Sequence, residues 1–111
     1  MASAMMREKK RYILVEAYAP MPEDTDSFKK GLYAELVKCA GQLEYHRMNP
    51  HVVEFLAGNR FILRASLEGT PAIVASLAFV KSVNGAENAF YTLRSSGTLR
   101  ALREYAKALL G

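Results

Sequence analysis

The chain has 111 residues, with 15 Lys or Arg against 11 Asp or Glu and a formal net charge of +4 at pH 7. This length is typical of one domain with one hydrophobic core and is too short for two. Half of the residues are hydrophobic and 23% are charged, which places the chain among globular proteins and excludes a disordered one.

The first two predicted elements are a strand and a helix. Residues 11–18 (RYILVEAY) are rich in strand formers, with the odd-numbered side chains from 13 to 17 on one face. After two prolines, a helix is expected to begin near Asp26 and to stop at Gly41, because apolar residues then recur at steps of three and four. The apolar positions of this helix are Phe28, Leu32, Leu36, Cys39, Ala40 and Leu43.

A polar connector up to Pro50 is followed by two expected antiparallel strands, over residues 51–56 and 60–67. The short Gly-containing link between these strands is suited to a hairpin. Thr70 then predicts a helix N-cap, with proline at the first helical position. This second helix carries mostly apolar residues.

An Asn-Gly turn at residues 84–85 precedes the last expected strand, over residues 89–95. Residues 95–98 (SSGT) interrupt that strand and supply a cap for a final helix. The apolar stripe of the final helix is Leu99, Leu102, Ala106 and Leu109.

The order βαββαβ plus a terminal helix predicts a ferredoxin-like, RRM-like α/β sandwich of the α+β class. We expect a four-stranded antiparallel sheet with two helices on one face. Residues 1–5 are expected to be a disordered start or a cloning remnant, and residues 6–111 a single domain.

Alternation along the strands predicts that the other face of the sheet mixes arginine with aromatic and apolar residues. The side chains expected on this open face are Tyr12, Tyr18, Arg60, Ile62, Arg64, Ser66, Phe90 and Arg94. Guanidinium groups suit phosphate and aromatic rings suit unpaired bases, so this face could contact RNA. Leu14, Ile62 and Phe90 would leave an apolar patch there, so the terminal helix or a partner is expected to cover part of it.

Two further groups of basic residues could bind phosphate. Arg100, Arg103 and Lys107 align on one stripe of the final helix, although a solvated helix face explains them as well. Thr98 begins this helix and either caps it or places its N–H groups near a phosphate. The densest basic cluster lies before the first strand and consists of Arg7, Lys9, Lys10 and Arg11.

Catalytic, metal-binding and secretory signals are missing from the sequence. The lone Cys39 cannot form an internal disulfide, and His46 and His51 lack further ligands at metal spacing. No nucleophile elbow, phosphate loop or dinucleotide motif is present. No apolar run approaches a membrane span and the start has no signal-peptide core, so we expect a cytoplasmic protein that meets no membrane.

Three short segments carry a family resemblance when taken in order: residues 7–14 (REKKRYIL), 59–64 (NRFILR) and 96–102 (SGTLRAL). Together they resemble archaeal ribonuclease P protein component 2, the Pop-five-like family. The similarity runs from residue 6 to residue 110, and the length matches as well. The shared order makes the combination specific although each motif is short.

This resemblance implies a ribonucleoprotein subunit that binds ribonuclease P RNA and supports removal of the 5′ leader from precursor tRNA in tRNA processing. In such an endonuclease the RNA and its magnesium ions perform the hydrolysis, and this chain would have no catalytic residue, no metal and no cofactor of its own. The implied protein partner is the TIM-barrel component 3, with a homodimer of this chain inside a heterotetramer. Precursor tRNA would be met through the holoenzyme.

The RNA-contact candidates come from both lines of reasoning. The resemblance implies Arg7, Lys9, Lys10, Arg11, Arg60, Arg64 and Arg100, and the expected faces add Arg94, Thr98 and Arg103. Residues 59–67 lack the glycine- and aromatic-rich signature of RNA recognition motifs, so contact with the RNA backbone is expected instead of base stacking. The acidic start of the first helix, around Asp24, should face away from RNA or toward a protein partner.

Two alternatives remain open at this point. One is a ferredoxin-like protein-interaction or ligand-sensing module that does not bind RNA, since fold alone does not decide function. The other is a small phosphoester hydrolase, which would have to act without added RNA.

Overall fold

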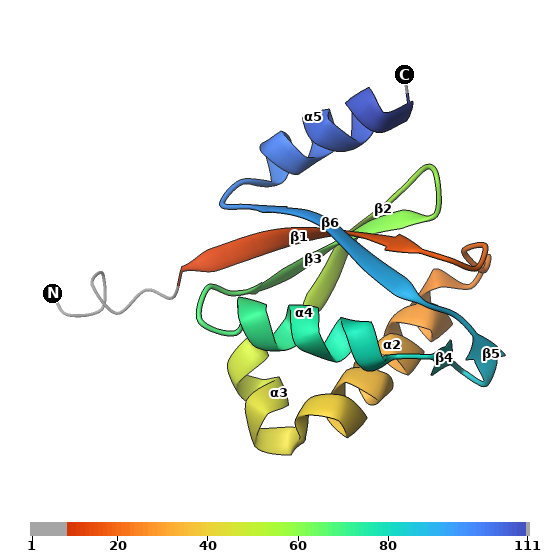
Figure 1. The fold of residues 1–111 in the computed structure, drawn as a ribbon, viewed down its shortest axis with the longest axis vertical. Coiled ribbons are helices and arrows are strands. Elements are labelled where there is room, and N and C mark those ends of the chain that lie inside the picture. The colour runs from red at the N-terminus through yellow and green to blue at the C-terminus, as the bar shows by residue number, and fades with distance from the viewer. Residues whose placement is uncertain (1–8, 111) are drawn as a thin grey trace, which may run out of the picture.

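The computed structural model describes residues 9–110 and consists of a four-stranded sheet between two unequal helical layers (Figure 1). The strand order is β2-β3-β1-β6, and every neighbouring pair is antiparallel. The strands are β1 (Lys10–Ala17), β2 (His51–Leu56), β3 (Arg60–Ser66) and β6 (Phe90–Ser96). This topology confirms the expected ferredoxin-like fold.

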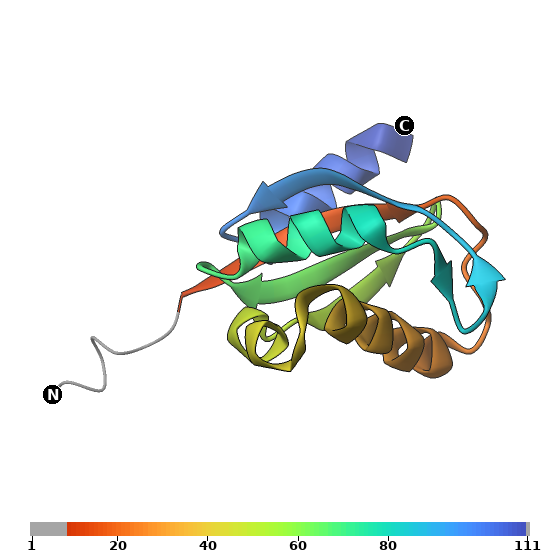
Figure 2. The same ribbon diagram turned by 60° about the horizontal axis from the view of Figure 1, so that its bottom comes forward.

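Three helices cover one face of the sheet and a single helix covers the other (Figures 1 and 2). We call these the inner face and the outer face. The inner layer holds α2 (Thr25–Ala40), α3 (Gln42–Met48) and α4 (Thr70–Phe79), and α5 (Leu99–Leu110) lies on the outer face. A small hairpin of β4 (Ser82–Val83) and β5 (Ala86–Glu87) extends from the end of α4.

The main core lies between the sheet and the inner helices. Alternate residues of β1 and β3, among them Ile13 and Leu63, pack there against the apolar sides of α2 and α4. Phe28 of α2 contacts Phe61 and Phe90 edge-on or tilted, with ring centroids 5.8 and 6.1 Å apart. Such ring pairs contribute about 0.5–1.5 kcal/mol beyond their buried area.

A second, smaller core lies between the outer face and α5. Its fully buried members are Leu14, Ile62, Leu102 and Ala106. The expectation that the terminal helix covers apolar residues of the outer face is confirmed for Leu14 and Ile62. The outer face is therefore not an open sheet surface of the kind that stacks RNA bases.

Phe90 was expected on the outer face and lies in the inner core, so that expectation is wrong. The cause is a β-bulge: Leu14 pairs with Arg94 and Val15 pairs with Thr92, which leaves one extra residue in β6. An extra residue reverses the alternation of side chains along a strand. Arg94 therefore does lie on the outer side although Phe90 does not.

The connector expected over residues 42–50 contains a seven-residue helix, α3. Leu43, expected on the apolar stripe of the preceding helix, belongs to α3 and is exposed, as is Cys39. Gly41 does end α2, with φ of 86°. A residue with that φ breaks one helix but does not prevent the next from starting directly afterwards.

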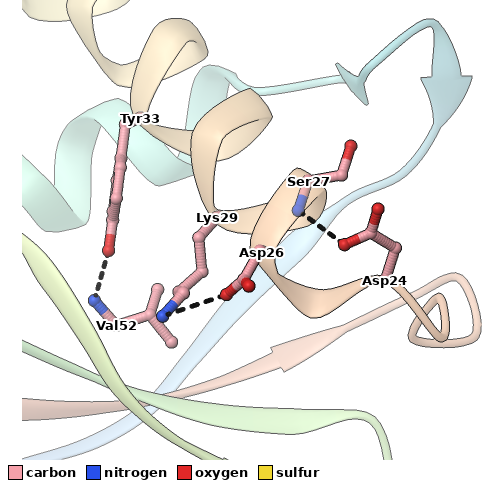
Figure 3. A network of polar contacts seen from close by, with 6 residues as sticks. All are labelled: Asp24, Asp26, Ser27, Lys29, Tyr33 and Val52. Carbon is pink, nitrogen blue, oxygen red and sulfur yellow. Dashed lines mark hydrogen bonds and ion pairs between the residues drawn. The ribbon is translucent and has the colours of Figure 1, made fainter.

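Local capping agrees with the sequence at α2 and differs at α4. Asp24 accepts a hydrogen bond from the Ser27 N–H at 3.0 Å, which caps α2 (Figure 3). At α4 the cap residue is Gly69 and not Thr70, whose hydroxyl instead donates to the Ser66 carbonyl at 3.0 Å. Ser66 was expected on the outer face, but it is buried and donates to the Arg47 carbonyl at 2.8 Å.

Tyr33 links the inner helices to the edge of the sheet. Its hydroxyl accepts a hydrogen bond from the Val52 N–H at 2.9 Å, and Lys29 lies 3.8 Å from Asp26 nearby (Figure 3). Because Val52 is in β2, this bond ties α2 to the strand that carries His51.

Among residues 9–110, no helix is long and apolar enough to cross a bilayer.

Candidate functional site

The outer side of the molecule brings together five of the expected RNA-contact arginines. Arg60 and Arg64 come from β3, Arg94 from the end of β6, and Arg100 and Arg103 from α5. Arg7 lies outside the described residues. The five arginines of the outer side differ in burial and in ion pairing, and these differences decide which guanidinium groups can bind an anion.

Arg60 was expected to be an outward arginine that is not part of the core. Its side chain is only 13% exposed, and Nη2 lies 3.4 Å from Glu16 Oε2. Gly58 at the β2–β3 turn has both Arg60 and Leu110 of α5 close by, so the end of α5 helps to enclose this guanidinium. Nε and Nη1 are buried without a hydrogen-bond partner among the described residues. In this arrangement the structure does not present Arg60 to a partner.

The two arginines of α5 each pair with a carboxylate. Arg103 Nη2 lies 2.7 Å from Glu54 Oε1 on β2, and this hydrogen bond raises the pKa of Arg103 further. Arg100 Nε lies 3.2 Å from Glu104 one turn along the helix. These carboxylates partly neutralise the basic stripe that was expected on the final helix.

Arg94 is exposed and stacks on α5. Its guanidinium carbon lies 4.6 Å from the centre of the Tyr105 ring, a cation–π contact. Beside it, Thr98 accepts a hydrogen bond from the Ala101 N–H at 3.3 Å. Capping therefore accounts for Thr98, and Arg94 serves partly to hold α5 on the sheet.

Arg64 differs from these four arginines. It makes no ion pair, hydrogen bond or ring contact with another residue in the part of the chain that the structure describes. Its cross-strand partners are His51 on β2 and Tyr12 on β1. Tyr12 in turn pairs with Ser96 on β6, so these four residues form one row across all four strands.

Lys10 belongs to the same corner as Arg64 and His51. It pairs with Ser66, two residues beyond Arg64 on β3, and its charge acts on His51. Burial lowers the pKa of His51 below its ordinary value, and the charges of Arg64 and Lys10 lower it further. His51 was not among the expected RNA contacts, because the sequence was searched there only for metal ligands and His51 lacks them at suitable spacing. Only the strand register brings it beside Arg64.

Lys9 and Arg11 lie at the entry to β1 and flank this corner. Lys9 is exposed, and Arg11 is half-buried beside Gly97. The acidic start of α2, including Asp24 and Asp26, belongs to the helical layer on the inner side of the sheet (Figures 1 and 2). The expectation that these carboxylates face away from RNA or toward a protein partner stays a prediction.

Two other features of the described residues bear on chemistry. A groove of about 290 Å³ runs between β2 and α5, with acidic and basic side chains together on its rim, among them Glu54, Arg103 and Lys107. Residues 9–110 contain no group of three or more His, Cys, Asp or Glu side chains that could hold a metal ion. The candidate site is the positively charged corner around Arg64 and His51.

Fold and surface together define a ferredoxin-like protein with a basic corner beside a helix-covered sheet. The profile of the Rpp14/Pop5 family matches residues 11–107. The chain belongs to the Rpp14/Pop5 family of ribonuclease P subunits.

Curated relatives agree with this assignment. Ribonuclease P protein component 2 of Methanosphaerula palustris is 36% identical over 101 residues, which cover 88% of this chain and 61% of the relative. The protein of the same name from Thermococcus gammatolerans is 27% identical over 107 residues, covering 96% and 89%. The resemblance read from the three sequence segments is thereby confirmed.

A solved structure supports the fold. A chain in the cryo-EM structure of yeast Ribonuclease MRP superposes with a TM-score of 0.62, covering 94% of this chain and 90% of that chain at 13% identity. At this identity the likeness concerns the fold alone.

Proposed function

We propose that this protein is an RNA-binding subunit of ribonuclease P that assists the catalytic RNA in removing the 5′ leader of precursor tRNA. The observation that carries the proposal is its membership of the Rpp14/Pop5 family over residues 11–107. Its relatives named ribonuclease P protein component 2 match along most of this chain. The basic corner on the outer side adds a surface suited to an RNA backbone.

In this proposal the chain contributes positive charge and positioning, and the RNA with its bound magnesium ions contributes the chemistry. The described residues offer guanidinium, ammonium and imidazole groups at the corner, which can neutralise the charge of phosphate groups. A carboxylate cluster suited to magnesium is not found among residues 9–110. The proposal assigns the magnesium ions to the RNA.

The proposed protein partner is component 3, in an assembly that contains two copies of this chain.

The alternative function is an interaction module that would pair through an apolar outer face of the sheet. The apolar residues Leu14 and Ile62 of that face are covered by α5 and are not exposed to a partner. The exposed side of α4 is apolar and carries no charged residue, with Val74 and Phe79 at 37% and 71% exposure. An uncharged surface suits a protein better than a phosphate polymer.

Reconstitution tests the proposed function directly. Precursor tRNA is incubated with ribonuclease P RNA alone, with the RNA plus this chain, and with the RNA plus this chain and component 3. We expect cleavage at the 5′ leader to increase when the proteins are added at a low magnesium concentration where the RNA alone is slow.

This chain alone should leave precursor tRNA intact, and cleavage without RNA would instead favour the hydrolase alternative. RNA affinity should also fall with salt, with a logarithmic slope of roughly 0.9 for each neutralised phosphate of a duplex. Absent or salt-insensitive binding would show that the proposal is wrong.

A further inference from the structure

The groove between β2 and α5 combines apolar walls with a charged rim. Its volume is about 290 Å³, and its apolar lining includes Leu56 and Leu110. Apolar residues inside a polar rim are the usual arrangement of a protein–protein contact. Acidic and basic side chains balance each other on the rim, so the groove itself does not attract a phosphate polymer. These rim residues are Glu54, Arg103, Glu104 and Lys107.

A buried guanidinium group lies close to one end of this groove. Among residues 9–110, the only buried side-chain nitrogen or oxygen atoms without a hydrogen-bond partner are Nε and Nη1 of Arg60. The third nitrogen, Nη2, lies 3.4 Å from Glu16 Oε2, whereas a charge-assisted hydrogen bond usually measures about 2.7–2.9 Å. Glu16 therefore satisfies Arg60 only in part. Because unpaired N–H groups of a buried charge destabilise the fold, an added acceptor would bind there favourably.

Two residues of the groove wall are also neighbours of Arg60. Leu56 is the residue opposite Arg60 in the β2–β3 pair. A Cβ atom at Gly58 would lie 3.0 Å from Arg60 Nη1 and 3.5 Å from Leu110 Cδ2, so the end of α5 lies beside the guanidinium. Leu110 is 59% exposed, and its side chain is free to rotate toward solvent. Such a rotation would open the groove toward Nη1.

We propose that this groove and Arg60 form a docking site for a protein segment in which an apolar side chain lies next to a carboxylate. The apolar side chain would pack against Leu56 and Leu110, and the carboxylate would accept hydrogen bonds from Nε or Nη1 of Arg60. Pockets for drug-sized ligands measure roughly 300–1,000 Å³, so this groove suits one side chain and the group beside it.

The docking site is separate from the basic corner. Leu56 and Arg60 lie at one end of the β2–β3 pair, and His51 and Arg64 lie at the other. The proposal therefore goes beyond RNA binding and does not depend on it. A protein segment in the groove and RNA at the corner would not compete for the same residues.

The smallest probe with this chemistry is N-acetyl-leucine, which carries an isobutyl side chain and a carboxylate on the same carbon. N-acetyl-leucinamide has the side chain without the charge, and acetate has the charge without the side chain. An NMR titration of the isotopically labelled full chain at pH 7 measures the three affinities. We expect N-acetyl-leucine to bind about tenfold more tightly than either control, the usual effect of a hydrogen bond to a charged group. The signals that should move are the backbone N–H groups of Leu56, Gly58 and Leu110 and the Nε–H of Arg60.

Variants separate the apolar part of the site from the charged part. Ala57 is exposed and lines the groove, so Ala57→Leu should fill the groove and abolish binding of both leucine probes. Ala78→Leu, at an exposed position of α4, is the matched control and should bind like the wild type. Arg60→Met should lower the affinity for N-acetyl-leucine to that for its amide and leave the amide unaffected. Thermal melting checks that each variant is folded.

Three results would contradict the proposal. Equal affinities for N-acetyl-leucine and its amide would mean that Arg60 has no part in docking. Inorganic phosphate that moves the Arg60 Nε–H as strongly as N-acetyl-leucine at equal ionic strength would assign this guanidinium to RNA instead. Unchanged signals at Leu56 and Leu110 with every probe would exclude the groove. None of these results affects RNA binding at the corner, which the salt dependence measures separately.

Discussion

Arg64 and His51 occupy paired positions on two neighbouring strands, and their chemistry depends on that pairing. His51 Nε2 lies 3.1 Å from Asn49 Oδ1. The pKa of His51 is lowered by burial first and by the charges of Arg64 and Lys10 second, so uptake of a second proton by the imidazole is opposed.

This shift predicts a measurable dependence on pH. Since the pKa of His51 is lower in the folded state than in the unfolded state, the folded state binds fewer protons around pH 6. The contribution of His51 to the free energy of unfolding should therefore be fully present above its unfolded-state pKa of about 6.5. The free energy of unfolding should decline slightly as the pH falls through the folded-state pKa of His51. Denaturant unfolding at pH 7.5 and 5.5 checks this, and His51→Gln should reduce the difference between the two free energies of unfolding.

RNA binding at the corner formed by Lys10, Arg64 and His51 should act on His51 in the opposite direction. A phosphate beside the imidazole favours its protonated form and raises its pKa. An NMR titration of the histidine ring with and without RNA measures the change. A His51 pKa that stays the same when RNA binds would mean that RNA lies elsewhere.

At the scale of elements, the buried and exposed sides of α5 have different roles. Its buried side closes the second core, and its exposed side carries arginines paired with carboxylates. Arg94 and Tyr105 fasten one flank of the helix to β6, while Arg103 and Glu54 fasten the other to β2. The helix is therefore mainly a cover for the sheet.

Truncation of the buried side of α5 should lower stability more than truncation of its exposed side. Leu102 is fully buried, and Leu102→Ala should reduce the free energy of unfolding by about 2–5 kcal/mol. Leu109 is 44% exposed, and Leu109→Ala should change it by about 0.5 kcal/mol or less. Urea unfolding measures both, and equal effects would contradict the packing of α5 on Leu14 and Ile62.

At the scale of the whole molecule, the sheet separates two surfaces of different character. The outer side carries the basic corner, and the inner side carries the acidic start of α2 and the uncharged exposed side of α4 (Figure 2). A net charge of +4 is modest, so this distribution matters more than the total. RNA and a protein partner could then bind at the same time on opposite sides.

Equal charge changes on the two sides should have unequal effects. His51→Glu adds a negative charge beside Arg64 and should weaken RNA binding more than tenfold at 0.1 M salt, by roughly the loss of one phosphate contact plus repulsion. Val74→Glu adds the same charge on α4 and should leave RNA affinity unchanged. Filter binding or fluorescence anisotropy measures both, and equal losses would mean that RNA binding does not distinguish the two sides.

The sequence was sufficient for the fold class and for the order of the four main strands and of helices α2, α4 and α5. Strand alternation and helical periodicity are local properties, so β1, β2, α4 and α5 could be placed to within a residue or two of where the structure has them. The candidate arginines were likewise visible as residue types. Gly41 marked the end of α2 in the sequence. Helix α3 was not predicted, because a seven-residue helix leaves little periodic signal.

Only the tertiary structure decided which of those arginines have a guanidinium group that is free to contact a phosphate. The bulge in β6 changed the face of Phe90, and ion pairs with Glu16 and Glu54 engaged Arg60 and Arg103. These features depend on residues far apart in the chain, and no local pattern reports them. By itself the sequence determined a basic ferredoxin-like subunit. The packing of α5 and the strand register then left Arg64, beside His51, as an outer-side arginine with no carboxylate partner among residues 9–110.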